Sequence, residues 1–237
     1  MTTETKHRIT QIQSGKIPDG YKKFTDSNYV VPNEWSEDNF SNIFAILRNN
    51  TFTRAEMNDE NGVVRNIHYG DVLIKYEENI DCNIEEIPFI NTDVELKKNS
   101  DYLMNGDVVI ADTAEDNTVG KAAEICNIGK KRILAGLHTI PCRPRKKRFA
   151  SKYLGYYINS PLYHTQLIPL ITGIKVSSIS RSAILDTKIL LPPMPEQQKI
   201  ARILSAQDKV ISLRQKLLQE KQRQKKYLMR KLLSQDG

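Results

Sequence analysis

The last fifth of the chain is a long segment in which nothing interrupts a helix. After Pro192, Pro193 and Pro195 the sequence contains neither proline nor glycine until Gly237. Clustered prolines remove backbone donors and disfavour helix before them, and a helix can run unbroken once they have passed. A helix over 195–233 has 39 residues and a length of about 58 Å at 1.5 Å per residue. Because an average globular helix is about a third as long, the sequence predicts a folded body with a long helical extension.

Apolar residues within this segment recur every seven positions, with Lys225 as the exception, and most have an apolar neighbour one position earlier. This spacing is typical of a helix that packs along another helix. A compact body is too short to cover the whole stripe, so we expect helix–helix pairing. The expected contact residues, called the seam below, are Ile203, Leu204, Val210, Ile211, Leu217, Leu218 and Leu232.

The net charge of +7 is located in the same segment. Residues 195–237 hold 11 lysines and arginines against four acidic residues, and the preceding 194 residues hold 24 of each sign. The basic faces of the helix have three interpretations: a solvated surface, a binding site for a partner protein, or a surface that follows DNA. Residues 71–116 carry 13 acidic and three basic side chains, whereas residues 117–152 carry ten basic and one acidic. We therefore expect one face that attracts phosphate and another that repels it.

The rest of the chain has the pattern of a strand-rich α+β domain. We expect a polar arm over 1–32 with a short helix near Lys6–Gln13, a domain over 33–192 whose packed body starts near Trp35, and the long helix within 193–237. Helices are also predicted over Ser151–Asn159 and Pro161–Ile168. The predicted strands are short apolar or β-branched runs: Ile43–Leu47, Val72–Tyr76, Val108–Ala111, Arg132–Ile140 and Lys188–Leu191.

One short pattern occurs twice. Tyr69-Gly70-Asp71-Val72 and Asn105-Gly106-Asp107-Val108 lie 36 residues apart. Two units are too few for a repeat architecture. Each copy predicts a Gly-Asp turn followed by a buried strand.

Composition is that of an ordinary globular protein. Hydrophobic residues at 39% and charged residues at 27% exclude disorder for most of the chain. The odd cysteine count, without a CxxC pair, suits a reducing compartment. Residues 153–174 are free of charge but contain two prolines and two glycines, which argues against a membrane helix. We expect a soluble, cytoplasmic protein.

The patterns of common catalytic sites are missing. No two glycines are spaced as GxG, so dinucleotide and similar cofactor turns are not expected. Gly129-Lys130 lacks the upstream glycine of a phosphate-binding loop, because position 124 is glutamate. Cys126, His138 and Cys142 have an uncharacteristic spacing for zinc and no evident fourth ligand. We predict no catalytic residue, no metal site and no cofactor in this chain.

The densest basic cluster joins a predicted strand to a predicted helix. Residues 143–149 read Arg-Pro-Arg-Lys-Lys-Arg-Phe, a composition that can hold phosphates; neutralisation of the acidic segment 71–116 is the competing explanation. A second loop, around Thr172-Gly173, offers short polar side chains that could approach bases. The expected phosphate contacts are Arg143, Arg145, Lys146, Lys147 and Arg148, and those nearer the bases are Thr172, Lys175 and Ser177.

Taken in order, several motifs resemble the specificity subunit of type I restriction–modification systems. The string runs from the His-Tyr-Gly-Asp-Val-Leu at 68–73 through Gly106-Asp107, Gly120-Lys121, Arg143-Pro144 and Thr172-Gly173 to the Pro-Pro-Met-Pro-Glu-Gln-Gln at 192–198. The last element, which opens the long helix, is the most distinctive. The resemblance covers about residues 30–235 and adds Lys121 to the expected DNA contacts.

The resemblance implies a division of labour. Residues 33–192 would be a target recognition domain that binds double-stranded DNA and reads one half of a split sequence. Residues 193–237 would be a conserved spacer helix that docks methyltransferase subunits, with Pro193, Glu196, Gln197 and the seam as contacts. AdoMet, and ATP and Mg²⁺ for restriction, would act in those partners. The family's usual member has two recognition domains and two spacer helices, so this chain is expected to be a half-subunit or a truncated one, and a homodimer would close its seam.

Two alternatives come from other functional classes. Asp81, Glu95 and Lys97 faintly suggest a self-contained Mg²⁺-dependent nuclease. A coiled-coil scaffold without any DNA role is the other. Cleavage by the purified chain would identify the first, and the absence of salt-sensitive DNA binding would favour the second.

Overall fold

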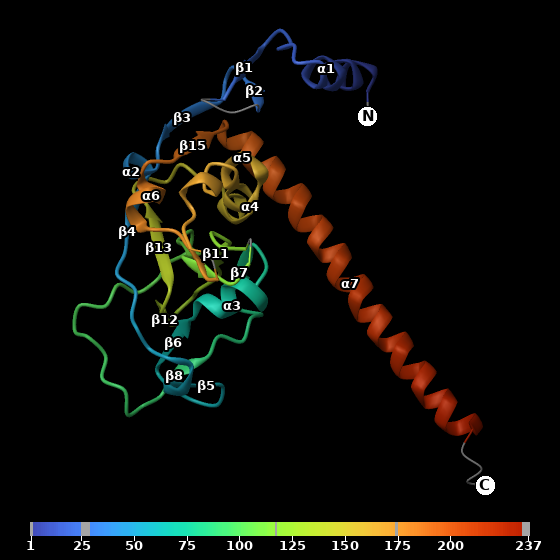
Figure 1. Ribbon diagram of the computed structural model, residues 1–237. Coiled ribbons are helices and arrows are strands. Elements are labelled where there is room, and N and C mark those ends of the chain that lie inside the picture. Colours follow the sequence, from blue (N-terminus) through green and yellow to red (C-terminus); the bar gives the residue numbers. More distant parts are fainter. Residues whose placement is uncertain (1, 25–28, 117, 174, 234–237) are drawn as a thin grey trace.

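A computed structural model describes residues 2–24, 29–116, 118–173 and 175–233. Two parts are evident in Figure 1: a mixed body and the single long helix α7, Met194–Leu233, which leaves the body and extends away from it. The expectation of an α+β fold with a long C-terminal helix is confirmed. The proline cluster explains where the helix starts, since Met194 and Pro195 occupy its first turn, where a missing N–H costs nothing.

The centre of the body is a five-stranded sheet. Its order is β4 (Phe44–Ile46), β13 (Thr139–Pro144), β9 (Val108–Ala111), β11 (Ala122–Cys126) and β7 (Asn79–Asp81). All neighbours are antiparallel except β11 and β7. Along β9, Val108 and Ile110 join one hydrophobic cluster whereas Val109 and Ala111 join another. Because strand side chains alternate between faces, this sheet has a packed core on each side.

Smaller sheets surround the central one. A four-stranded sheet has the order β12 (Arg132–Ala135), β6 (Val64–Ile67), β8 (Phe89–Ile90) and β5 (Met57–Asn58). Three two-stranded pairs are β1 (Tyr21–Lys23) with β2 (Val30–Pro32), β3 (Ser36–Asn39) with β15 (Lys188–Leu191), and β10 (Thr113–Ala114) with β14 (Ser177–Ser178). Short helices connect them: α1 (Thr3–Gln13), α2 (Phe40–Ile43), η1 (Arg54–Glu56), α3 (Tyr69–Ile74), α4 (Tyr153–Asn159), α5 (Pro161–His164), η2 (Ile168–Leu170) and α6 (Arg181–Leu185).

Two strand predictions need correction. The run Val72–Tyr76 is not a strand, because helix α3 occupies most of it. His68 starts this helix, since its Nδ1 accepts the backbone N–H of Gly70, and an apolar run of this length does not by itself distinguish helix from strand. The run Arg132–Ile140 is two strands, β12 and β13, separated by a turn in which His138 has a φ of 53°.

The packed body reaches further toward the N-terminus than Trp35. Phe24 and Val31, which flank the β1–β2 hairpin connection, are buried in the same cluster as Phe40 and Phe44. Helix α1 contains the predicted segment Lys6–Gln13 and buries no residue.

Helix α7 is fixed to the body through its first turns. Gln197 is only 2% exposed; its Oε1 accepts the N–H of Ala150 at 2.9 Å, and its Nε2 donates to the carbonyl oxygens of Pro192 and Arg148 at 2.9 and 3.0 Å. Trp35 Nε1 donates to Glu196 Oε2 at 2.8 Å. From residue 209 to 233 every side chain is exposed. The helix is therefore held at one end and otherwise uncovered.

One buried carboxyl group gives the fold a pH dependence. Glu124 in β11 is 1% exposed and accepts the backbone N–H groups of Lys152 at 2.7 Å and Gly155 at 3.2 Å. Burial raises its pKa from 4.5 to about 7 despite these hydrogen bonds. Between pH 4.5 and 7 the folded state therefore holds a proton that the unfolded state has lost, so this group lowers stability as pH rises through that window.

We expect Glu124 to lower the free energy of unfolding by up to about 3 kcal/mol between pH 4.5 and pH 7. Urea denaturation of the wild type and Glu124→Gln at pH 4.5, 6 and 7.5 measures it as the difference between the two proteins, which cancels carboxylates common to both. A difference that does not change with pH would contradict this assignment.

Candidate nucleic-acid interface

The basic loop over 143–149 follows β13 and lies beside the start of α7. Arg145 Nε donates to the carbonyl oxygens of Ser41 at 3.3 Å and Phe44 at 3.1 Å. Arg148 Nη1 lies 3.7 Å from Asp38 Oδ2, and its carbonyl oxygen is held by Gln197. Lys146 and Lys147 are exposed. The loop is thus anchored by its arginines and presents its two lysines to solvent.

Arg143, by contrast, binds a buried carboxylate with a guanidinium that is itself half-buried. It forms a bidentate ion pair with Asp107, Nε to Oδ1 at 2.9 Å and Nη2 to Oδ2 at 2.7 Å, and Nη2 also donates to the carbonyl oxygen of Tyr102. Asp107 is 1% exposed. Since Asp107 belongs to the acidic segment, neutralisation within the domain accounts for Arg143, and the pairing counts against the expected phosphate contact.

In both copies of the repeated Gly-Asp pattern, the aspartate is bound by an arginine. Asp71 is bound by Arg54 through Nη1 at 3.0 Å and Nη2 at 2.8 Å, as Asp107 is by Arg143. Both aspartates are buried. The expected strand follows only the second copy, in β9, whereas the first copy lies in helix α3. The pattern therefore marks two buried carboxylates, each bound by an arginine that is itself partly exposed.

Lys121 also binds other parts of the protein rather than facing solvent. Its Nζ donates to the carbonyl oxygens of Leu73 at 3.0 Å and Tyr76 at 2.9 Å. These carbonyl groups lie at and just beyond the C-terminal end of α3, where a cation is favourable. The expected DNA contact of Lys121 is not supported by this geometry.

The polar loop at 172–178 lies at the other end of β13 from the basic loop. Thr172 and Ser178 exchange backbone hydrogen bonds at 2.9 and 2.8 Å, and β14 pairs with β10. Gly173 has a φ of 109°, and a Cβ there would lie 2.0 Å from the carbonyl oxygen of Val176, so the turn requires glycine. Lys175 is exposed and Ser177 half-buried.

The two expected contact regions are consequently not brought together. β10 follows the end of β9 that pairs with Thr139, whereas the basic loop follows Pro144. Five residues of strand separate these ends by about 17 Å. A single DNA groove contact cannot join the basic loop and the polar loop at one point, although one duplex could span both.

His138 forms a strained turn at the end of β13 where the polar loop lies. His138, with its positive φ, has Nδ1 3.4 Å from Asp112 Oδ1 and from Thr113 Oγ1. Its ring packs edge-on against Tyr69 at 5.2 Å between centroids, and its side chain is 47% exposed. Non-glycine residues with positive φ occur often at functional sites. This turn and the 172–178 loop form one polar surface.

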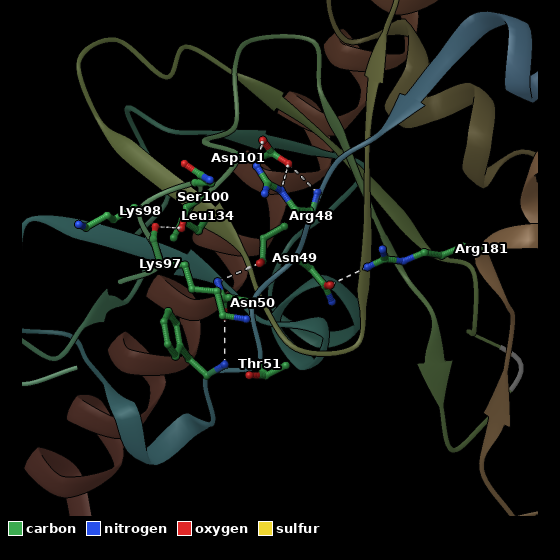
Figure 2. Close-up of a pocket in the computed structure, with 13 residues that line it drawn as sticks. Arg48, Asn49, Asn50, Thr51, Lys97, Lys98, Ser100, Asp101, Leu134 and Arg181 are labelled. Atoms are coloured by element: carbon green, nitrogen blue, oxygen red, sulfur yellow. Dashed lines mark hydrogen bonds and ion pairs between the residues drawn. The ribbon is translucent and has the colours of Figure 1, made fainter. Parts of the chain in front are cut away.

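Next to the same turn lies a groove of about 540 Å³ that no motif of the sequence predicts. It is built from four separate segments: residues 48–52 after β4, residues 97–101, the end of β12 and the start of α6. Figure 2 shows Arg48 paired with Asp101 and Arg181 with Asn49 across it. Asn49 Nδ2 in turn donates to the carbonyl oxygen of Gly136 in the His138 turn. Four cations line the groove against one acidic side chain: Arg48, Lys97, Lys98, Arg181 and Asp101.

The groups suggested for catalysis or metal binding are placed as follows. Asp81 accepts hydrogen bonds from the Asn83 N–H and the Asn127 amide. Burial raises the pKa of the Cys126 thiol to about 12, which keeps it protonated. Among the described residues no group of three or more His, Cys, Asp or Glu is arranged to hold a metal ion. In the same part of the chain, no helix has the length and apolar character needed to cross a membrane.

Comparison with known proteins gives a consistent result. A family model for the type I restriction modification DNA specificity domain matches residues 32–222. The putative type I restriction enzyme MjaX specificity subunit of Methanocaldococcus jannaschii is 25% identical over 207 residues, which cover 86% of this chain and 46% of that protein.

Solved structures share the fold. The HsdS subunit from Thermoanaerobacter tengcongensis superposes with a TM-score of 0.51 at 16% identity, over 90% of this chain and 46% of that one. The type I restriction-modification S subunit from M. genitalium gives 0.51 at 15%, over 86% and 46%. A chain described under complex assembly and conformational transition of the type I R-M system gives 0.56 at 14%, over 97% and 51%. This chain spans about half the length of the relatives it matches.

Proposed function

Because this chain belongs to the family of type I restriction modification DNA specificity domains, we propose that it is a non-catalytic module that recognises one half of a bipartite DNA target and directs methyltransferase subunits to it. The observation that carries the proposal is the extent of the family match, which includes both the body and most of α7. We assign residues 33–192 to target recognition and residues 193–237 to the spacer. AdoMet-dependent methylation, and ATP- and Mg²⁺-dependent restriction, belong to the partner subunits.

The surface of the body supports DNA binding. Lys146 and Lys147 are exposed on an anchored loop, and the groove next to the His138 turn carries three more cations than acidic groups. Arg145 and Arg148 position the loop. Lysines at these places neutralise phosphates without reading sequence.

The surface of α7 supports pairing with a second copy of this chain. The seam residues are 38–76% exposed, although such leucines and isoleucines normally lie in a core. One copy spans about half of each relative, so two copies would supply the two domains and two helices of a whole relative. Antiparallel pairing about a two-fold axis would place the recognition domains at opposite ends, and the target would then be an inverted repeat.

The contacts of Glu196 and Gln197 reduce the number of residues that can touch a partner subunit directly. Both side chains bind the body, through Trp35 and Ala150, so their role in docking is indirect: they fix the direction of the helix. Pro193 is exposed and stays a candidate contact, as does the seam.

Co-expression with the products of the neighbouring genes tests the proposal, and we expect methyltransferase subunits among them. We expect the subunits to co-purify and to methylate a bipartite sequence with inverted symmetry when this is the only specificity chain present. The chain alone should neither methylate nor cut DNA. Sequence-independent methylation, a methylated site without inverted symmetry, or Mg²⁺-dependent cleavage by the chain alone would overturn the proposal.

A separate measurement concerns the basic loop. We expect Lys146→Gln with Lys147→Gln to weaken binding to all DNA sequences and to lower the slope of log affinity against log salt by about two, since each phosphate contact contributes about 0.9. Preference among sequences should be unchanged. Lys16→Gln with Lys130→Gln removes two exposed lysines elsewhere as the control. An unchanged slope in the loop variant would show that these two lysines do not contact phosphates.

A further inference from the structure

We propose that the groove between residues 48–52 and residues 97–101 is the base-reading site of the domain, with Asn99 and Thr51 contacting bases and Lys97 and Lys98 contacting the neighbouring phosphates. The inference rests on the proposed function, because it takes duplex DNA to be the ligand. It adds a site to the sequence-based expectation, which places Thr172, Lys175 and Ser177 nearer the bases.

The groove has a rigid floor. Asn50 Nδ2 donates to Asn66 Oδ1 at 2.7 Å and to the carbonyl oxygen of Ala135 at 2.9 Å, and its Oδ1 accepts the N–H of Phe52. Asn66 itself is fully buried. The floor amides are therefore committed to the protein and cannot change partner when a ligand arrives. A site that is held in place before binding loses less entropy on binding.

The loop that forms one wall is also held. Asp101 accepts the backbone N–H and the Nε of Arg48 at 2.9 and 3.0 Å, and Nη2 at 3.2 Å. Ser100 Oγ donates to the carbonyl oxygen of Lys97. These contacts set the distance between the two walls and neutralise Arg48, so the uncompensated charge of the groove is carried by Lys97, Lys98 and Arg181.

Four side chains on the walls remain available. Thr51, Lys97, Lys98 and Asn99 are exposed, and within the described part of the chain their side chains form no hydrogen bond or ion pair. Figure 2 shows Thr51 on one wall and Lys97 and Lys98 on the other. The available set thus combines one amide, one hydroxyl and two cations around a fixed floor.

This set has the chemistry of direct readout. An asparagine amide offers a donor and an acceptor that match N6 and N7 of adenine, a threonine offers a hydroxyl and a methyl group, and lysines neutralise phosphates. Phe52 and Leu134 add apolar surface suited to a thymine methyl group. The basic loop has only cations at its exposed tip, which can contact phosphates or a guanine edge but do not match an adenine edge. Recognition of an A·T pair is therefore assigned to the groove.

Selection of bound duplexes from a random pool by the full-length chain tests the inference, with the preference at each position measured by sequencing. We expect Asn99→Ala with Thr51→Val to reduce discrimination at one or two adjacent positions about tenfold and to keep the salt slope. Lys97→Gln with Lys98→Gln should do the reverse, lowering the slope by about two with the preference retained. Asn83→Ala changes an exposed asparagine in another turn and is the matched control.

The outcomes separate this inference from the proposed function. If the wild type selects no sequence, the proposed function fails. If the wild type selects a sequence and Asn99→Ala with Thr51→Val selects the same one with equal discrimination, the groove does not read bases. The melting temperature of each variant shows whether the variant is folded. Because the substituted side chains are exposed and form no hydrogen bond, we expect the melting temperatures to equal that of the wild type.

Discussion

Replacing Ile211 and Leu218 by aspartate is expected to prevent the proposed pairing of two chains and to abolish bipartite recognition. The two side chains are 53% and 59% exposed on an isolated α7 and would be buried in a paired one. Each dimer would then hold four aspartates without partners in an apolar seam, at a cost of several kcal/mol per charge. We expect the dissociation constant to rise at least a thousandfold, as measured by sedimentation equilibrium at tens of micromolar chain.

Ser212→Asp provides the matched control. Ser212 is exposed on α7 and, at 3.6 residues per turn, points away from the face that carries the seam, so its substitution should leave the dimer intact. A wild type that stays strictly monomeric at tens of micromolar would contradict the pairing. So would a double variant that dimerises as tightly as the wild type.

The second large effect concerns the ion pair between Arg143 and Asp107. Asp107→Ala is expected to lower the free energy of unfolding by about 3 kcal/mol, because it leaves the half-buried Arg143 guanidinium without its carboxylate. The side chains of Arg143 and Asp107 are 30% and 1% exposed, so solvent can screen only one partner. For a chain of this size the loss corresponds to a fall of about 6–12 °C in melting temperature.

An exposed pair and a double variant provide the comparison. Asp101→Ala breaks the Arg48 pair, whose arginine side chain is 64% exposed, and should cost less than about 1 kcal/mol. Asp107→Leu with Arg143→Met removes both charges together and should be less destabilising than Asp107→Ala alone. Equal losses in Asp107→Ala and Asp101→Ala would show that burial does not strengthen the dependence of Arg143 on its partner.

The long helix could be predicted from the sequence because it depends on local spacing. Nothing between Pro195 and Leu233 breaks a helix, and tertiary contacts affect only the first turns. The run at 72–76 could not be assigned in the same way, since the deciding contact is the ring nitrogen of His68 on the N–H of Gly70. Short apolar runs take the structure that their neighbours impose.

The groove, and whether a given basic side chain is paired or exposed, depend on contacts between residues far apart in the sequence. Arg143 and Asp107 lie 36 residues apart, and Arg181 reaches Asn49 across 132 residues. A basic residue in a charged cluster therefore looks the same in the sequence whether it neutralises a buried carboxylate or faces solvent. Only the folded structure shows that Lys121 Nζ binds two backbone carbonyl oxygens, whereas Lys97 and Lys98 face solvent.

The single anchoring of α7 makes it a lever. Twenty-five residues, 209–233, extend beyond the last contact with the body, a free length of about 37 Å. That last contact joins the Tyr156 hydroxyl to Ser205 and Asp208. A tilt of about 5° there moves the far end by about 3 Å, close to the 3.4 Å rise of one base pair along a strand. In a paired assembly, the tolerance for one base pair more or less between the half-sites then depends on the angular stiffness of the contacts between α7 and the body, rather than on the length of the helix.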